Sequence, residues 1–484
     1  MNGPIRRLAI GMFTAFGALL LAVTWFQVIR ADDLKSDPRN ARPAQTEQAK
    51  ERGLIVTIDG TVVARSLPVE DSRNYVRDYP EGEVFAHAVG YSSYLVGDSG
   101  LEASRASTLR SRRDVTISDL IAGILGTDLR PKNLEITIDA RLQRAAFEAL
   151  GAHRGAVVAL DPVTGAILAL VSTPSYDPNL LLGPDAASQW EDLSTDPASP
   201  LSDRATRELY APGSTFKTVV SITGNDTGIA VPNTTFADPE EFPLPGSTAT
   251  ISNAWGGVCN NGVSVTLLQA FARSCNTIFA DLAIQVGAGE IGKTVEALGW
   301  NQDLDFEWRI PRAVWRTAQL ATDPAALGQS GIGERDVRAT PFHMAMIASA
   351  VANNGLVISP YLVEGVFDAD GEQVESTTPQ LLGRAMTEAT VSAMTLMMER
   401  VVTDGTGRSA AIPGVRVAGK TGTATGTGDF PNLWFIGFAP VEAPTIALAV
   451  FVEGTTATGA SASGGAVAAP IAREIMDVWL ELNR

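Results

Sequence analysis

The stretch Tyr210-Ala-Pro-Gly-Ser-Thr-Phe-Lys217 places a hydroxyl group and an amine three residues apart. The turn at Pro212-Gly213, followed by apolar and β-branched residues, predicts that Ser214 opens a helix. Side chains three residues apart lie on one face of a helix, whose N-terminal end favours negative charge. This spacing suits a serine nucleophile, Ser214, that is activated by Lys217. By itself, however, Ser-x-x-Lys is more often a solvated helix face than a catalytic pair.

Two further motifs follow along the chain, Ser274-Cys275-Asn276 and Lys420-Thr421-Gly422. The sequence contains six lysines, and two of them complete the first and the third motif. A serine hydroxyl needs a base to act as a nucleophile at neutral pH, and none of the three histidines lies in a motif. Lys217 can be that base if burial and the charge of Lys420 lower its pKa.

The N-terminal segment is long and apolar. Residues 8–29 read LAIGMFTAFGALLLAVTWFQVI without a charge, and about twenty such residues cross a membrane as a helix. Arg6 and Arg7 precede the segment, so the positive-inside rule predicts a cytoplasmic tail at residues 1–7 and an extracytoplasmic remainder. A cleaved signal peptide is the alternative, but the bulky stretch Thr24-Trp25-Phe26-Gln27 stands where cleavage requires small residues. We therefore expect a single-pass protein of the cell membrane.

Charge and cysteine content narrow the function classes. The 484 residues carry a formal net charge of −17 and no basic patch, which argues against a nucleic-acid partner. The sequence implies no cofactor and no metal. Both cysteines, Cys259 and Cys275, lie in the predicted exported part, where a disulfide can persist. Two small buried thiols are the alternative, since sequence gives separation and not geometry.

The chain after the apolar segment divides into two regions. Residues 30–133 are predicted to be a linker and a smaller, mostly β domain, which begins with a hairpin around Asp59-Gly60. Residues 134–484 form a larger domain with two strands early, helices in the middle, three strands late and a helix at the end. Its predicted strands are 155–160, 166–171, 415–424, 433–438 and 445–451, and its predicted helices include 140–150, 266–287, 340–353, 386–401 and 469–482. We expect the early and late strands to meet in one antiparallel sheet, an α+β arrangement.

With its three motifs in this order, the chain resembles the class B penicillin-binding proteins, which are monofunctional peptidoglycan transpeptidases, and especially their short actinobacterial penicillin-binding protein A type. The resemblance covers nearly the whole chain. It also includes Arg52-Gly53, Asp59-Gly60, Gly100-Leu-Glu102, Leu142-Gln143, Asp161-Pro-Val-Thr-Gly165, Tyr210-x-Pro-Gly213, Gly405-Thr-Gly407 and Trp434-Phe-Ile-Gly-Phe438. It implies an α/β/α sandwich with a central antiparallel sheet of about five strands at 134–484, preceded by a transmembrane helix and a pedestal of the dimerisation type.

The resemblance also implies roles for the motif residues. Ser214 would form an acyl-enzyme, Ser274 would relay a proton between Lys217 and Lys420 or to the leaving amine, and Asn276 would donate to Lys217 and to the substrate's amide. Taken alone, Ser274 and Asn276 more often cap helix ends. The middle motif carries Cys275 where many relatives have another residue.

The third motif continues as Lys420-Thr421-Gly422-Thr423, a strand that in the resembling family runs beside the substrate. Its threonines would hold the terminal carboxylate of a D-alanyl-D-alanine stem, and the backbone amides of Ser214 and Thr423 would form the oxyanion hole. Trp434 and Phe435 could line the substrate, but an alternating apolar strand makes core packing the expected role.

Three functions remain to be distinguished. The leading hypothesis is a membrane-anchored serine D,D-transpeptidase that cross-links peptidoglycan stem peptides and is acylated by β-lactams at Ser214. A β-lactamase or D,D-carboxypeptidase would instead use water, and a β-lactam sensor would be acylated without turnover. Roughly a hundred residues between the apolar segment and residue 134 leave little room for a glycosyltransferase domain. By resemblance, the protein partner is a polytopic glycan-strand polymerase.

Overall fold

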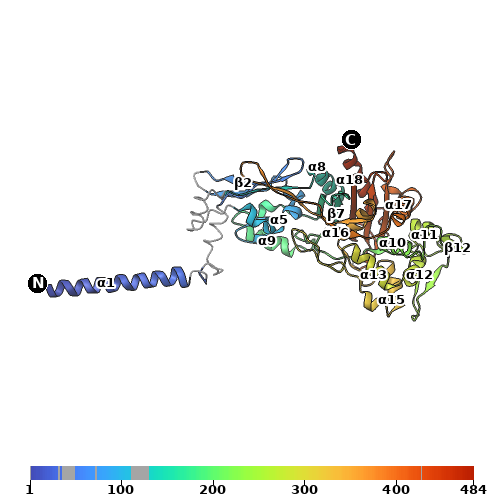
Figure 1. Ribbon diagram of the computed structural model, residues 1–484, viewed down its shortest axis with the longest axis horizontal. Helices are drawn as coiled ribbons and strands as arrows, with labels where there is room; N and C mark the ends of the chain where they lie inside the picture. Colours follow the sequence, from blue (N-terminus) through green and yellow to red (C-terminus); the bar gives the residue numbers. More distant parts are fainter. Residues whose placement is uncertain (1, 31–32, 35–49, 71–73, 111–129, 427) are drawn as a thin grey trace. The chain divides into compact units, whose positions relative to one another are not determined.

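The computed structural model describes residues 2–30, 33–34, 50–70, 74–110, 130–426 and 428–484. The chain divides into two compact units, residues 1–51 with 67–76, and residues 52–66 with 77–484. In the smaller unit, helix α1 (Asn2–Thr24) continues into a π-helical turn, η1 (Trp25–Ile29) (Figure 1). Residues 3–29 are long and apolar enough to span a membrane, so they fit a single-pass anchor. Most of the predicted linker, residues 31–51, lies outside the described residues.

The larger unit contains a five-stranded antiparallel sheet in the order β17-β18-β19-β7-β8. These strands are β7 (Gly155–Leu160), β8 (Ile167–Thr173), β17 (Ala418–Ala424), β18 (Asn432–Ala439) and β19 (Ile446–Val452). Strand β19 pairs with β7, with Val452 opposite Gly155. The prediction that two early and three late strands meet in one sheet is therefore confirmed, and β17 is an edge strand.

Helices cover both faces of this sheet (Figure 1). Helix α16 (Pro341–Ala352) packs on one face, and α8 (Ala140–Leu150) and α18 (Ala468–Leu482) pack on the other. Strands buried on both faces are mostly apolar, which explains the uninterrupted apolar sequences of β7 and β19. Trp434 and Phe435 are completely buried and point to opposite faces, so the prediction of core packing is confirmed.

The predicted helix over residues 266–287 is wrong as a continuous element. The structure has α11 (Leu267–Arg273) and α12 (Asn276–Val286) instead. Ser274 adopts a left-handed conformation with φ of 63°, which ends α11 and redirects the chain at the middle motif. Apolar periodicity continues through the break, so it did not reveal the interruption. The helices predicted at 340–353 and 386–401 are confirmed as α16 and α17 (Glu388–Thr403).

Most of a second sheet also belongs to the larger unit, in the order β15-β14-β6-β1-β2-β3. Its strands are β1 (Ile55–Thr57), β2 (Val62–Pro68), β3 (Tyr75–Asp78), β6 (Asn133–Ile136), β14 (Val363–Phe367) and β15 (Gln373–Ser376). The predicted hairpin around Asp59-Gly60 is confirmed, with Ile55 opposite Ala64. Because β14 and β15 come from the larger predicted domain, this sheet uses strands from both sides of residue 133. The domain boundary at 133/134 stays a prediction.

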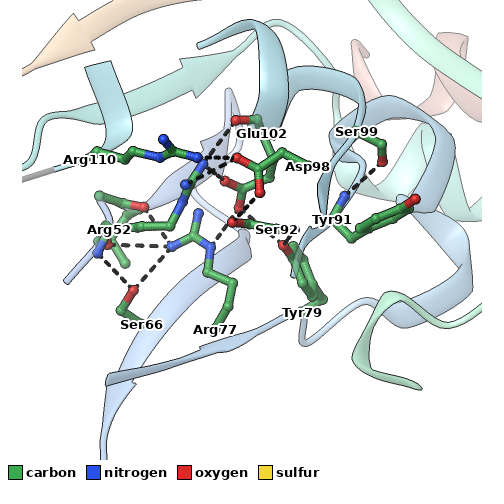
Figure 2. A network of polar contacts seen from close by, with 12 residues as sticks. Arg52, Ser66, Arg77, Tyr79, Tyr91, Ser92, Asp98, Ser99, Glu102 and Arg110 are labelled. Carbon is green, nitrogen blue, oxygen red and sulfur yellow. Dashed lines mark hydrogen bonds and ion pairs between the residues drawn. The ribbon is translucent and has the colours of Figure 1, made fainter. Parts of the chain in front are cut away.

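A buried carboxylate ties several segments of this second sheet together (Figure 2). Glu102 has no exposed surface and accepts from Arg52 Nη2 at 2.5 Å and from Arg77 Nε at 2.6 Å. Arg77 also donates to the Gly53 carbonyl oxygen at 2.8 Å. Burial by itself would raise the pKa of Glu102, but the charges of Arg77 and Arg52 lower it below its ordinary value. The carboxylate is therefore ionised and shared between two buried guanidinium groups.

Replacing Glu102 should destabilise the protein more than the small change in side-chain size suggests. The nearly isosteric Glu102→Gln leaves Arg52 and Arg77 buried without a counter-charge, and breaking a buried ion pair costs about 3–5 kcal/mol. We expect that loss in the free energy of unfolding, measured with a chemical denaturant. Asp303→Asn removes a carboxylate from an exposed pair with Arg312 and should leave the unfolding midpoint unchanged. Equal effects of the two substitutions would contradict this account.

Candidate active site

The segment that carries Ser214 lies directly against the edge strand β17. Gly213 has φ of 52°, and a Cβ atom there would lie 2.7 Å from the Thr423 carbonyl oxygen. Glycine is therefore needed for both the conformation and the approach. A 3₁₀ turn, η4 (Gly213–Phe216), leads into α10 (Lys217–Asp226), so Ser214 does open a helix, as predicted. Ser214 is partly exposed, whereas the next three residues are buried.

Lys217 is completely buried and reaches from α10 to the break between α11 and α12. Its Nζ donates to the Ser274 carbonyl oxygen at 2.6 Å and to Asn276 Oδ1 at 2.7 Å, and lies 3.3 Å from Ser274 Oγ. The donation runs from Lys217 to Asn276, so the expectation that Asn276 donates to Lys217 is wrong, because Lys217 meets the amide oxygen. A neutral amine has two N–H groups, and the hydrogen bonds to the Ser274 carbonyl oxygen and to Asn276 Oδ1 occupy both. Its lone pair is thereby left to accept a proton.

Lys420 completes the cluster from the third motif. This lysine on β17 is also completely buried, and its Nζ donates to Ser274 Oγ and to the Thr421 carbonyl oxygen, each at 2.9 Å. The Ser274 hydroxyl thus lies within hydrogen-bonding distance of both lysine amines. The three motifs, distant in sequence, meet at this one hydroxyl.

The two amines have depressed pKa values. Burial, the larger cause, and the charge of Lys420 lower the pKa of Lys217 well below its ordinary value of 10.5, while Glu334 acts in the opposite direction. Burial lowers the pKa of Lys420 to about 7. Each amine also lies 5.6 Å from the centre of a phenyl ring, Lys217 from Phe279 and Lys420 from Phe271. A buried lysine with a depressed pKa is able to act as a base near neutral pH.

The remaining residues of the third motif line the same edge. A Cβ atom at Gly422 would lie 2.9 Å from the Pro212 carbonyl oxygen, so this glycine allows the nucleophile's segment to pack on β17. Thr421 is buried and its hydroxyl lies 2.5 Å from Thr406 Oγ1. The Thr423 side chain is exposed, although its hydroxyl accepts the Gly464 N–H at 3.3 Å.

A neighbouring loop holds the middle motif in place. Asn253 Oδ1 accepts the backbone N–H groups of Asn276 at 2.7 Å and Thr277 at 3.3 Å, which begin α12. Cys275 is joined to Cys259 by a disulfide, with Cα atoms 5.8 Å apart. Both links fix the backbone that directly follows Ser274.

The Cys259 end of this disulfide is organised by one carboxylate. Asp238 accepts four successive backbone N–H groups, those of residues 259–262, at 2.7–2.9 Å. Burial opposes ionisation of Asp238, but these donors lower its pKa below the ordinary value. Sequence reasoning missed both Asp238 and Asn253, because neither stands in a motif and their partners lie more than twenty residues away.

A serine in the turn beside the edge strand of a five-stranded antiparallel sheet, with two buried lysines around a second serine, is typical of the penicillin-recognising serine acyltransferases. Residues 155–477 match the family model of the penicillin-binding protein transpeptidase domain, and residues 52–133 match the penicillin-binding protein A dimerisation domain. The chain therefore belongs to the penicillin-binding protein transpeptidase family.

Individual relatives are similar over their full lengths. The peptidoglycan D,D-transpeptidases PbpA of Mycolicibacterium smegmatis and Mycobacterium tuberculosis are each 39% identical to this chain, over 98% and 99% of both sequences. The ceftriaxone acyl-enzyme of penicillin-binding protein A from M. tuberculosis aligns with a TM-score of 0.82 and 36% identity, over 90% of this chain and 99% of that one. The D,D-transpeptidase domain of a peptidoglycan glycosyltransferase from Eggerthella lenta aligns with a TM-score of 0.79 and 34% identity, over 90% and 99%.

The depressed pKa of Lys217 predicts the pH dependence of acylation. If unprotonated Lys217 activates Ser214, the rate rises with pH through the pKa of this lysine, and that rise lies well below pH 10.5. The second-order rate of acylation by benzylpenicillin, measured between pH 5 and 10, tests this. A rise centred near the pKa of an ordinary lysine would contradict it.

The disulfide should stabilise the protein and assist the site without being essential. It closes a loop with a sequence separation of 16, for which chain entropy gives about 3 kcal/mol. We expect the double variant Cys259→Ser, Cys275→Ser to lose that free energy of unfolding. Its acylation should slow by roughly two- to tenfold, since Asn253 and Asp238 still hold the motif.

Chemical labelling provides the control for this prediction. In the denatured wild-type protein, alkylation of both cysteines by iodoacetamide should require prior reduction. Equal mass shifts with and without the reductant would show that the bond is not formed in solution.

Proposed function

We propose that the protein is a membrane-anchored peptidoglycan D,D-transpeptidase that transfers a stem peptide through an acyl-enzyme on Ser214. The observation that carries the proposal is the position of the Ser274 hydroxyl, 3.3 Å from one buried lysine amine and 2.9 Å from the other. A proton that Lys217 takes from Ser214 can pass through the Ser274 hydroxyl towards Lys420. The activity of the mycobacterial relatives, named peptidoglycan D,D-transpeptidases, supports the same conclusion.

The proposed acylation uses Lys217 as the base and Ser274 as the proton relay. Lys217 takes the Ser214 proton, and Oγ attacks the carbonyl carbon of the penultimate D-alanine. The peptide C–N bond breaks, and the leaving amine receives a proton by way of Ser274, from Lys217 or Lys420. Asn276, whose oxygen is held by Lys217, has amide N–H groups to offer the substrate; one of them donates to the Ser252 carbonyl oxygen at 3.0 Å.

Strand β17 is the proposed binding edge for the stem. Its outer edge is unpaired in the sheet order, so an extended peptide can align along Thr421, Gly422 and Thr423. The backbone N–H groups of Ser214 and Thr423 are the proposed oxyanion-hole donors, each worth roughly 3–4 kcal/mol of transition-state stabilisation. The close packing of Gly213 on the Thr423 carbonyl supports a fixed distance between these donors.

The proposed setting is the outer face of the cell membrane. Arg6 and Arg7 support a cytoplasmic N-terminus and an extracytoplasmic catalytic domain at residues 134–484. Residues 30–133 would be the linker and pedestal, and a polytopic glycan-strand polymerase would supply the strands to be cross-linked. The proposed polymerase partner rests on the family resemblance alone.

Labelling with a fluorescent penicillin tests the proposed function. The wild type should form a stable covalent adduct, and Ser214→Ala should form none while keeping the wild-type melting temperature. The neighbouring Ser221→Ala, a buried serine outside the motifs, serves as the matched control and should still label.

The fate of the adduct separates the alternatives. Stable label together with transfer of a stem analogue to an amine supports a transpeptidase. Rapid release by water would indicate a β-lactamase or D,D-carboxypeptidase instead. Stable label without any transfer would indicate a sensor, and no label on the wild type would overturn the role of Ser214.

A further inference from the structure

Glu334 lies beside the segment that carries the nucleophile, although it belongs to no motif. It follows α15 (Pro324–Gly331) in the connection to α16. The preceding residue, Gly333, accepts the Gly213 N–H at 3.0 Å, and a Cβ atom at Gly333 would lie 1.9 Å from the Gly213 carbonyl oxygen. No side chain fits between these two backbones. Glu334 therefore directly follows a residue whose backbone contacts the segment that carries Ser214.

The Glu334 carboxylate also contacts the end of the substrate strand. Its Oε1 accepts the backbone N–H of Thr425 at 3.1 Å. Thr425 is the residue directly after β17 and stands two residues after Thr423. The carboxylate therefore lies next to the C-terminal end of β17, two residues beyond the proposed oxyanion-hole donor Thr423.

The charge of Glu334 is unfavourable for the first half of the reaction. Its negative charge raises the pKa of Lys217, against the effects of burial and of Lys420. A base held in its protonated form to higher pH activates Ser214 less readily. The pKa of Glu334 is itself raised above its ordinary value by burial. Its hydrogen bonds to Thr425 and the charges of Arg338 and Lys217 act in the opposite direction. A negative charge next to the end of β17 is instead suited to bind a cation that enters in the second half-reaction.

That second half-reaction brings a cation to the site. An acyl acceptor of peptidoglycan is a primary amine, which is an ammonium ion at neutral pH and must lose a proton before it attacks. We propose that Glu334 binds the ammonium group of the acyl acceptor and takes its first proton, so that this residue selects a cationic amine over water. The inference rests on the proposed transpeptidase function and assigns the acceptor side of the same site.

The step balances in protons and electrons. The ammonium group gives one proton to the Glu334 carboxylate and becomes a neutral amine. Its lone pair attacks the ester carbon, the new C–N bond forms, and the bond from that carbon to Ser214 Oγ breaks. The second nitrogen proton passes through Lys217 to Ser214 Oγ, which restores the hydroxyl. Glu334 releases its proton to solvent.

Two nucleophiles of different charge test this role. A thioester analogue of the stem serves as the acyl donor, Nα-acetyl-lysine as the cationic acceptor, and hydroxylamine, uncharged at neutral pH, as the neutral one. Glu334→Gln keeps an oxygen for the Thr425 N–H but removes the charge. We expect the KM for Nα-acetyl-lysine to rise about tenfold, with hydroxylamine transfer and hydrolysis changed less than twofold.

Two matched variants accompany this measurement. Glu334→Asp keeps the negative charge and should retain most of the preference for Nα-acetyl-lysine. Asp336→Asn removes an exposed carboxylate from the same loop and should leave both acceptors unaffected. If Glu334→Gln and Glu334→Asp both reduce transfer to Nα-acetyl-lysine and to hydroxylamine by the same factor, the residue has only a structural role, and the inference fails.

Acylation by benzylpenicillin distinguishes this inference from the proposed function. Removing the negative charge lowers the pKa of Lys217, so the rise of the acylation rate should move to lower pH in Glu334→Gln. A wild-type protein that is not acylated at all would overturn the proposed function. A Glu334→Gln variant that is acylated normally and keeps the wild-type KM for Nα-acetyl-lysine would overturn the inference alone.

Discussion

The burial of two lysines around one serine hydroxyl is the interaction on which the rest of the site depends. Each amine loses its hydration, which lowers the pKa of both, and the charge of Lys420 lowers the pKa of Lys217 further. The chain offsets this cost with acceptors placed on separate elements: Ser274 and Asn276 at a helix break, and the Thr421 carbonyl on the sheet edge. A helix, a helix break and a strand must therefore be assembled before the base exists. The five-stranded sheet, completed by strands from both ends of the domain, provides that assembly.

Much of this fold was predictable from the sequence because its signals are local. Strand β7 coincides with the predicted range, and strands β18 and β19 alternate apolar side chains that belong to the cores on the two faces of the sheet. Of the motif residues identified as a set, Lys217, Ser274, Asn276 and Lys420 are joined by hydrogen bonds, and Ser214 lies in the turn that leads into the helix of Lys217. Their catalytic roles remain a proposal that these contacts support.

The features that escaped prediction depend on contacts between distant segments. The left-handed turn at Ser274 leaves no trace in apolar periodicity, since both helices remain apolar on either side. Asp238 and Asn253 act on backbone groups, which any sequence could supply. Glu334 is visible only once the loop before α16 is placed against Gly213. Contacts between such distant segments cannot be read from the order of residues along the chain.

The backbone contact between Gly213 and Gly333 has a consequence for engineering the acceptor preference. These glycines have φ values of 52° and 82°, and a methyl group on Gly333 would overlap the opposite carbonyl. A library that varies residues 334–338 can change the charge presented to the incoming amine while the two glycines keep the distance to the nucleophile constant. Randomising either glycine would alter the spacing and the charge together, so that selected clones would mix two unrelated causes. The pair thus marks the border between positions open to redesign and positions that must be held fixed.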